Sequence, residues 1–386
     1  MTCVHVRVSR EWEERMSGLV DGTTDGCPNR SNERAVSLSR KIQERTAMVG
    51  VIGLGYVGLP TMLGAATAGF GVTGIDISQE RVDRINSGLS YVEDVDSSTL
   101  ASLVEQKRID ATSDYGVIKD MDVIIICVPT PVNKYKEPEL GPLQETICSL
   151  SRYMDGEQLL ILQSTTFPGT TEELVLPKVQ ASGRQAGRDF YLAFSPERID
   201  PGNRGYSIHN IPKVVGGVTP QCGRIAASFL SAMVEQVVTV DSPKVAEMTK
   251  LLENIFRSVN IALVNELSEL CRRMDIDIWE VISAATTKPF GFMPFYPGIG
   301  VGGHCIPVDP FYLSWKAKEY DFYVSFIELA ARTNDNMPYY TVSRIVDILG
   351  NRGLVVSGAR LFLMGISFKK DIGDTRNSPA LRVAEL

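Results

Sequence analysis

The sequence is poor in the side chains that bind transition metals. It contains three histidines, and its seven cysteines include no C-x-x-C pair. Because a zinc site needs several such ligands at short, regular spacing, we expect no metal site. An odd number of cysteines without paired spacing is also unlike a disulfide framework, so we expect a reducing, cytoplasmic setting.

The sequence also lacks an excess of positive charge and a long apolar run. It has 39 Lys and Arg residues against 46 Asp and Glu residues, a net charge of −7, which is the wrong sign for a protein that holds nucleic acid by bulk charge. No apolar run reaches the ~18 residues needed to cross a bilayer, and the N-terminus lacks the apolar core of a secretory signal. We therefore expect neither a nucleic-acid nor a membrane partner, and an anionic small molecule would need a local site.

The 386 residues suffice for two or three domains. Residues 1–37 are polar and aperiodic, so we interpret them as a flexible extension. Residues 38–242 alternate short apolar runs with helical segments, which is typical of an α/β fold with a doubly wound, Rossmann-like parallel sheet. Within this domain we expect strands at 47–52, 71–77, 122–128, 159–164 and 190–194, and helices at 57–69 and about 79–87.

The middle of the chain is predicted to be helical. Apolar residues recur at helical spacing from Pro243 to about Asp277, which is longer than one small domain needs. We interpret this long central helix as a spine between two domains and as the surface of a homodimer. The helical middle domain is expected to cover residues 243–338, with further helices at about 310–320 and 323–334.

The last part of the chain is expected to return to an α/β pattern. A helix is predicted at 338–350, and the apolar run 359–364 then resembles the first strand of another sheet. We interpret residues 339–386 as the start of a second Rossmann-like domain. This domain is incomplete as it stands, because one strand and part of a helix cannot bury a core.

A glycine-rich loop follows the first expected strand and opens a helix. Gly53, Gly55 and Gly58 have the G-x-G-x-x-G spacing that lets a backbone approach a pyrophosphate at a helix N-terminus. Asp76, at the end of the second expected strand, would accept hydrogen bonds from the adenosine ribose and repel a 2′-phosphate, so we expect NAD rather than NADP. A glycine turn without a ligand is the alternative. It is disfavoured here because the strand, the helix and the acidic residue all stand at the positions that the dinucleotide-binding pattern requires.

A later strand end carries another candidate for the cofactor site. Thr130, in the motif V-P-T-P, is a candidate nicotinamide contact, although a rigid strand exit explains the motif almost equally well. The expected cofactor contacts are Gly53, Gly55, Tyr56, Val57, Gly58, Asp76, Thr130 and Thr165.

A second glycine-rich stretch precedes Cys305. The glycines between Gly298 and Gly303 let the backbone come close to a ligand, and prolines on both sides stiffen the loop. Asp309 followed by Pro310 predicts a helix start with the aspartate as N-cap, and a helix N-terminus lowers the pKa of a nearby thiol. Cys305 is therefore the candidate nucleophile. The cysteines in apolar segments are interpreted as small buried side chains: Cys127, Cys148, Cys222 and Cys271.

Two further pairs of polar residues are candidates for the site. Lys250 and Asn254 are four residues apart, so they share one helix face and would bind an oxyanion, although a solvated helix face explains the spacing about as well. Thr165 and Glu197 follow two strands that end at the same sheet edge as the cofactor loop. Glu197 would act as a general acid or base and Thr165 would hold a water, although turn and cap roles explain each residue singly.

Seven motifs stand in order along the chain: GLGYVGLP (53–60), VPTP (128–131), STTFPGTT (164–171), SPER (195–198), KLLEN (250–254), GVGGHCIPVDP (300–310) and SFKKDIGDTRNSPA (367–380). From about Leu38 to Leu386, the sequence resembles the nucleotide-sugar 6-dehydrogenase family, which contains the UDP-glucose and GDP-mannose dehydrogenases. His304 and Val308 stand where enzymes acting on UDP-glucose usually have a serine and a lysine. The stretches SPERIDPGN, KPFGFMPFYPG and GGHCIPVDPFYL are most similar to the UDP-N-acetylhexosamine branch, particularly UDP-N-acetylglucosamine 6-dehydrogenases.

The resemblance implies an NAD-dependent, four-electron oxidation of the C6 alcohol of a UDP-sugar to a carboxylate, through a thiohemiacetal and a thioester on Cys305. It implies that Lys250 stabilises the oxyanion, with Asn254 as its hydrogen-bonding partner. Asp309 would position or deprotonate water, and Thr165 and Glu197 would take part in acid–base catalysis and in holding water. It also implies a product used in polysaccharide synthesis. The implied substrate contacts are Glu197, Arg198, Lys250, Asn254, Phe295, Tyr296, Gly298, Gly302 and Lys369.

Other interpretations remain open. UDP-N-acetylglucosamine is the first candidate substrate, with UDP-N-acetylmannosamine and UDP-glucose as alternatives. A non-catalytic sensor of NAD or of a nucleotide sugar would bind these ligands without forming NADH. A two-electron hydroxyacid dehydrogenase would use Lys250 and Asn254 without a thiol.

Overall fold

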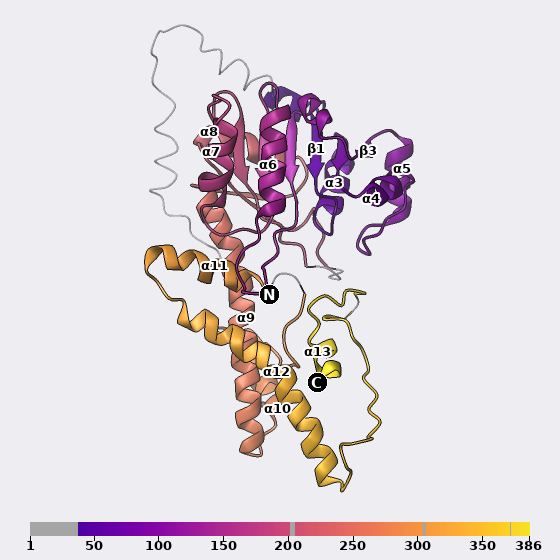
Figure 1. Cartoon of the computed structure of the whole chain (residues 1–386). Helices are drawn as coiled ribbons and strands as arrows, with labels where there is room; N and C mark the ends of the chain where they lie inside the picture. Colours follow the sequence, from indigo (N-terminus) through magenta and orange to yellow (C-terminus); the bar gives the residue numbers. More distant parts are fainter. Residues whose placement is uncertain (1–37, 201–204, 304–305, 371) are drawn as a thin grey trace.

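The computed structural model describes residues 38–200, 205–303, 306–370 and 372–386 (Figure 1). The extension expected at 1–37 lies outside the described residues, as do His304 and the candidate nucleophile Cys305. Residues 38–43 are helical and bury Leu38 and Ile42 against the first part of the fold.

One eight-stranded sheet organises the first half of the chain. Its strand order is β3-β2-β1-β4-β5-β6-β7-β8, and every neighbouring pair is parallel except β6 and β7. This confirms the doubly wound, Rossmann-like fold. The strands are β1 (Met48–Ile52), β2 (Gly71–Ile75), β3 (Ile109–Thr112), β4 (Val123–Ile126), β5 (Leu159–Leu162), β6 (Tyr191–Phe194), β7 (Lys213–Gly217) and β8 (Val237–Val240).

Five of these strands, β1, β2, β4, β5 and β6, are the five that the sequence predicts. The prediction missed β3, β7 and β8. The missed strands carry polar residues or glycines, and β3 and β8 are the edge strands of the sheet. Edge strands bury less surface, so they lack the continuous apolar run that marks a central parallel strand.

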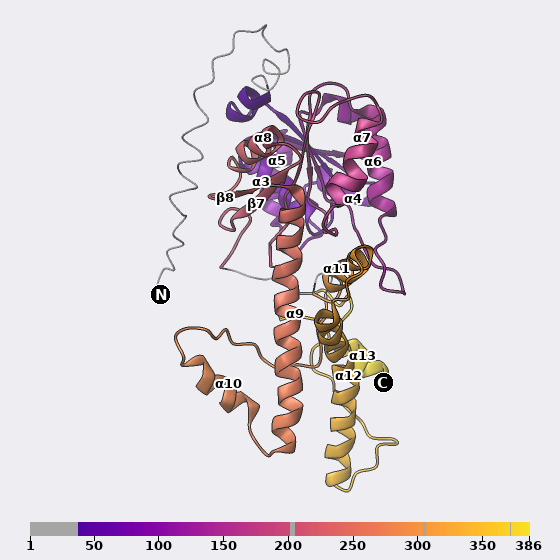
Figure 2. The same cartoon turned by 90° about the vertical axis from the view of Figure 1, so that its left-hand side faces the viewer.

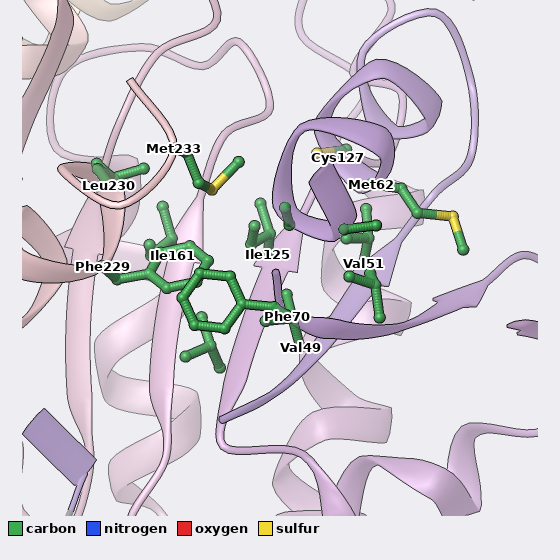
Figure 3. Packing of buried hydrophobic residues seen from close by; sticks show 14 of the residues in the cluster. Val49, Val51, Met62, Phe70, Ile125, Cys127, Ile161, Phe229, Leu230 and Met233 are labelled. Carbon is green, nitrogen blue, oxygen red and sulfur yellow. The ribbon is translucent and has the colours of Figure 1, made fainter. Parts of the chain in front are cut away.

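Helices cover both faces of the sheet, and alternate residues of each central strand face opposite layers. Ile125 and Ile161 belong to one buried cluster, whereas Ile124 and Leu160 belong to the other. Figure 3 shows Ile125 and Ile161 in the first cluster together with Phe229 of α8. The covering elements are α3 (Gly58–Thr67), α4 (Gln79–Asn86), α5 (Ser97–Glu105), the 3₁₀ helix η1 (Tyr115–Asp120), α6 (Gly141–Tyr153), the π-helical turn η2 (Thr171–Val175), α7 (Leu176–Gln180) and α8 (Pro220–Leu230).

The predicted long helix is α9 (Pro243–Arg273), which has 31 residues and is therefore about 46 Å long. The hydroxyl of Ser242 accepts a hydrogen bond from the Val245 N–H and caps its start. Its first turns pack against β6, β7 and η2, and the rest of it runs along α12 (Figures 1 and 2). The helix thus carries side chains from the edge of the sheet into the helical part. Among the described residues, no helix is both long and apolar enough to span a membrane.

The helical part consists of α10 (Ile278–Thr286), α11 (Asp309–Ala317), the short 3₁₀ helix η3 (Lys318–Tyr320) and α12 (Ser325–Asn351). The prediction of two helices at 323–334 and 338–350 is wrong, because α12 continues through Pro338. A proline removes one backbone hydrogen bond from a helix. Here Pro338 is buried and the helix packs along α9, so tertiary packing outweighs that loss.

The strand predicted at 359–364 does not form. These residues have no regular secondary structure, and Phe362 and Met364 are more than four-fifths exposed. A single strand has no neighbour to pair its backbone N–H and C=O groups, so an apolar run alone does not make one. The chain then reaches α13 (Pro379–Glu385), which packs against α12 (Figure 2).

Candidate active site

The loop between β1 and α3 has the backbone shape that the glycine spacing predicts. Gly53 has φ +88°, and a Cβ on Gly58 would lie 1.8 Å from the Gly53 carbonyl oxygen, so neither position tolerates a side chain. A Cβ on Gly55, in contrast, would meet nothing within 4 Å. The space beside the backbone at Gly55 is therefore open, which fits a loop that a ligand approaches closely.

Asp76 lies at the end of β2 beside this loop, as expected. Its carboxylate accepts hydrogen bonds from the N–H groups of Leu54 at 2.8 Å and Ser78 at 2.9 Å, and it pairs with Arg81 at 3.2 Å. Two neighbours of this loop are not predicted from the sequence: Arg81, and Tyr91, whose hydroxyl donates to the Leu54 carbonyl. Burial raises the pKa of Tyr91 to about 12, so this hydroxyl keeps its proton.

Thr130 and Thr165 meet at the carboxyl edge of the sheet. The Thr130 hydroxyl donates to the Thr165 carbonyl oxygen at 2.6 Å, which joins the ends of β4 and β5. From the helical part, the Tyr312 hydroxyl of α11 donates to the Thr130 carbonyl oxygen at 2.5 Å. The two threonines therefore share one edge, as predicted, and α11 is fastened to it. Their contact with a cofactor stays a prediction.

Glu197 follows β6 and is buried. Its carboxylate pairs with Lys213 of β7 and accepts hydrogen bonds from Gln163 and from the backbone N–H groups of Arg198 and Ile199. Burial alone would raise the pKa of the Glu197 carboxyl, but the Lys213 ammonium and the N–H donors outweigh it, so the pKa lies below its ordinary value. Glu197 is thus held as an anion, and its predicted acid–base role remains untested.

Lys250 and Asn254 are both buried on α9, so a solvated helix face does not explain them. The Asn254 amide donates to the carboxylate of Asp309, and the Arg257 guanidinium donates to the Asn254 side-chain oxygen. Burial raises the pKa of the Asp309 carboxyl to about 6, and the positive charges of Lys250 and Arg257 only partly oppose this. We call these four side chains the polar centre. It brings α9 and the start of α11 together around a carboxyl that exchanges a proton near neutral pH.

Two details of the polar centre differ from the prediction. Asp309 is not the N-cap of its helix, because Val308 takes that position and the Asp309 carboxylate binds Asn254 instead. Arg257 was missed, although it stands one turn after Asn254 and so shares its helix face. The buried Nε of Arg257 has no hydrogen-bond partner among the described residues, which leaves a cationic donor unused.

Three of the other predicted substrate contacts, Phe295, Tyr296 and Gly298, lie against α9 and α10. Phe295 packs edge to face on Phe256 of α9, and Tyr296 stacks on Trp279 of α10. The N–H of Gly298 donates to the buried side-chain oxygen of Asn265 at 2.9 Å, which fixes the start of the glycine-rich loop to α9.

The C-terminal segment reaches both the glycine-rich loop and the end of β6. A Cβ on Gly302 would lie 2.5 Å from Phe368, so the loop and this segment are in close contact. Lys369 pairs with Asp200 at 2.7 Å, and Arg198 pairs with Glu253 of α9 at 2.7 Å.

The interpretation of four cysteines as buried is half right. Cys127 and Cys222 are buried, but Cys148 is exposed and Cys271 is partly exposed. Cys148 lies on α6, and other residues of this helix form its buried face. Cys148 therefore points away from the core although its neighbours in sequence are apolar.

Comparison with known protein families covers most of the described chain. Residues 47–239 match the NAD binding domain of the UDP-glucose/GDP-mannose dehydrogenase family, and residues 244–336 match the central domain of the same family. The first match spans the sheet with the glycine loop. The second spans α9 and the start of α11, which carry the polar centre.

Individual relatives agree with the family match. The chain is 38% identical over 345 residues to UDP-N-acetyl-D-glucosamine 6-dehydrogenase of Pseudomonas aeruginosa, covering 87% of this chain and 78% of the relative. It is 36% identical over 339 residues to UDP-N-acetyl-D-mannosamine dehydrogenase of Pyrococcus horikoshii, covering 88% and 80%. A solved structure of a dehydrogenase of the latter kind from Pyrococcus horikoshii superposes with a TM-score of 0.82 at 34% identity, over 88% of this chain and 80% of that one.

Proposed function

Because the chain belongs to the UDP-glucose/GDP-mannose dehydrogenase family, and is thus an NAD-dependent oxidoreductase, we propose that it oxidises the C6 alcohol of a UDP-N-acetylhexosamine to a carboxylate, with UDP-N-acetylglucosamine as the first candidate substrate. The buried polar centre carries this proposal. It supplies an ammonium group for an oxyanion and a carboxyl with a pKa of about 6 for proton exchange.

The residues around the first glycine loop fit NAD. The open space at Gly55 admits a pyrophosphate, and the buried carboxylate of Asp76 disfavours a 2′-phosphate. Thr130 and Thr165 would line the nicotinamide side at the opposite end of the same sheet edge. When bound, NAD accepts a hydride from the sugar carbon in each of the two oxidations.

The side chains of this protein would carry out the other steps of the reaction. The Cys305 thiolate adds to the C6 aldehyde, and its electron pair forms the C–S bond while the carbonyl π bond breaks to leave an oxyanion, which the Lys250 ammonium would stabilise. The second oxidation leaves a thioester, and water cleaves its C–S bond to give the carboxylate and the free thiol. Asp309 would take the proton that this water loses, and Asn254 would hold the Asp309 carboxyl in place.

The test is a substrate panel with NADH counting. UDP-N-acetylglucosamine, UDP-N-acetylmannosamine, UDP-glucose and GDP-mannose are each incubated with the enzyme and NAD. We expect two NADH and one carboxylate per sugar with one of the two UDP-N-acetylhexosamines. One NADH per sugar would indicate a two-electron dehydrogenase, and binding without NADH would indicate a sensor; either result overturns the proposal.

Two cysteine variants sharpen this test. Cys305→Ser should abolish formation of the carboxylate, because a serine hydroxyl does not replace the thiolate. Cys148→Ser is the matched control, since this exposed cysteine lies on α6 of the sheet domain and should leave turnover unchanged. Full carboxylate formation by Cys305→Ser would contradict the thioester route.

We also propose that the chain forms a homodimer through α9. Large apolar side chains recur on one face of this helix and are exposed. Their spacing of three, four and seven residues forms one stripe, opposite the face that packs on α12. A stripe of this kind on one face is self-complementary about a two-fold axis. Its members are Leu252, Phe256, Leu263, Leu267 and Leu270.

Sedimentation or light scattering tests the dimer. The wild-type protein should have twice the chain mass, and Leu263→Glu combined with Leu267→Glu should halve it. Leu361→Glu, also on an exposed apolar residue but outside α9, is the control. A wild-type monomer, or a double variant of unchanged mass, would exclude this interface.

A further inference from the structure

Glu247 is a fully buried carboxylate that has no part in the proposed chemistry. It lies on α9 and is 0% exposed. Its carboxylate accepts hydrogen bonds from the Gly169 N–H at 2.5 Å, from the Thr171 N–H at 2.9 Å and from the Thr171 hydroxyl at 2.7 Å. These three donors come from the loop that leaves β5 and from the first residue of η2, so Glu247 joins two distant parts of the chain.

Holding a carboxylate in this place has an energetic cost. Burial raises the pKa of the Glu247 carboxyl, and its donors from Thr171 and Gly169 only partly oppose this. Burying an ionised group without full compensation costs several kcal/mol in general, so such groups are uncommon where a neutral side chain would serve. The three hydrogen bonds from Gly169 and Thr171 recover part of this cost, because they favour the charged form of the carboxyl.

The two ends of this link are the two halves of the proposed site. On α9, Glu247 stands one turn before Lys250 and two turns before Asn254, so all three share a face. On the other side, Gly169 belongs to the same short loop as Thr165, and Thr171 is the first residue of η2, which follows this loop. Gly169 has φ +107° and a Cβ there would lie 2.4 Å from the Glu173 carboxylate, so the turn needs a glycine at this position.

We propose that Glu247 is a positioning residue, which fixes the loop of Thr165 at the distance from Lys250 that the reaction needs. This inference rests on the proposed function. Thr165 belongs to the cofactor side of the site, and Lys250 to the substrate side. A misplacement of about 1 Å between reacting groups can lower a rate by about 100-fold without weakening binding.

The test is Glu247→Gln. Glutamine has the same shape as glutamate, but one of the two oxygens that accept the N–H groups is replaced by an NH₂ group, which would face an N–H donor. We expect kcat to fall 10-fold to 100-fold, with KM for NAD and for the UDP-sugar changed less than 3-fold. Glu173→Gln is the matched control in the adjoining η2, because this partly exposed carboxylate pairs with Lys316 and Lys244 and accepts no hydrogen bond from Gly169 or Thr171 in the link to α9. It should leave kcat within 2-fold.

Two further measurements separate positioning from folding. If Glu247→Gln does not fold, Thr171→Val removes only the hydroxyl donor and should lower kcat by a smaller factor at an unchanged melting temperature. A purely structural role would lower the melting temperature of Glu247→Gln and leave kcat of the folded enzyme at the wild-type value. That result would overturn the proposal while the proposed function stands.

Amide hydrogen exchange tests the link without any turnover. Peptides covering residues 164–171 should exchange faster in Glu247→Gln than in the wild type, and should be unchanged in Glu173→Gln. Should the wild-type protein form no NADH with any sugar, the proposed function fails, and the exchange result still decides whether Glu247 fixes the loop. Unchanged exchange in Glu247→Gln would overturn the inference.

Discussion

A buried carboxyl group lies after the end of β6 and another lies at the start of α11, and their pKa values are shifted in opposite directions. Glu197, after β6, has a pKa below its ordinary value, whereas Asp309, at the start of α11, has one raised to about 6. Both carboxylates are buried and both have lysines nearby. The difference therefore comes from how each one is contacted, because burial alone would raise both pKa values.

Direct contact with a cation decides whether the pKa of the buried carboxyl lies below or above its ordinary value. Glu197 touches the Lys213 ammonium and also accepts two backbone N–H groups, and together these outweigh desolvation. Asp309 accepts its hydrogen bond from the neutral amide of Asn254, while the charges of Lys250 and Arg257 act without such a contact. A fixed anion thus lies in one region and a carboxyl with a pKa of about 6 lies in the other.

The largest effect should come from breaking the ion pair in the first region. Lys213→Met leaves Glu197 buried without its cation, and removal of one partner of a buried pair costs about 3–5 kcal/mol. We expect a matching downward shift of the urea unfolding midpoint. Lys244→Met is the control, because Lys244 is half exposed and its pairs with Glu172 and Glu173 contribute at most about 1 kcal/mol. Equal shifts for both variants would mean that burial does not distinguish the two lysines.

Asp309→Asn should have the next largest effect and acts on the second region. Below pH 6 the wild-type carboxyl is protonated and takes no proton from water, so kcat should rise with pH through about 6. The variant should lose this rise and about 100-fold in kcat. The control is Asp335→Asn, since Asp335 is paired with Lys136 at the surface and should keep the wild-type profile. A rise at pH 6 that persists in Asp309→Asn would assign it to another group.

The same pKa fixes the sign of a stability effect. The folded protein holds a proton on Asp309 up to about pH 6, whereas the unfolded chain releases it near the ordinary aspartate pKa of 3.8. The folded state therefore binds more protons between these values, and stability falls as pH rises from 4 to 6, by up to about 3 kcal/mol. Asp309→Asn should lack this contribution in urea titrations at the two pH values.

The sequence predicts the parts of this molecule that depend on local pattern. The apolar runs of β1, β4 and β5 and the glycine spacing at Gly53–Gly58 are local signals, and the structure follows them. The run at 359–364 has the same local signal but lacks neighbouring strands, so its prediction failed. Pro338 is the reverse case, since a local breaker is overridden by packing along α9.

The polar partners could be predicted only in part. Lys250 and Asn254 are found from their spacing, and the same spacing on one helix face extends to Glu247 and Arg257. Lys213 could not be found in this way, because a lysine in a strand usually points to solvent and its partner Glu197 lies after the end of a different strand, β6. Ion pairs between strands depend on the sheet order, which the sequence does not specify residue by residue.

The smallest expected effect concerns the contact that joins the two regions. The Tyr312 hydroxyl on α11 donates to the Thr130 carbonyl at the end of β4, so it ties the helix of Asp309 to the sheet that carries Glu197. Tyr312→Phe should cost about 1 kcal/mol, the usual net value of one hydrogen bond, and lower the melting temperature slightly. Tyr320→Phe, on an exposed ring, should cost nothing measurable.

The Tyr312 variant also tests whether the two carboxylates act as separate units. If they do, Tyr312→Phe keeps the rise of kcat through pH 6, because Asn254 and the charges around Asp309 are unchanged. If the rise moves by more than about half a pH unit, the hydrogen bond from α11 to the sheet controls the burial of Asp309. The contrast between the two regions would then depend on how α11 docks rather than on the local contacts of each carboxylate.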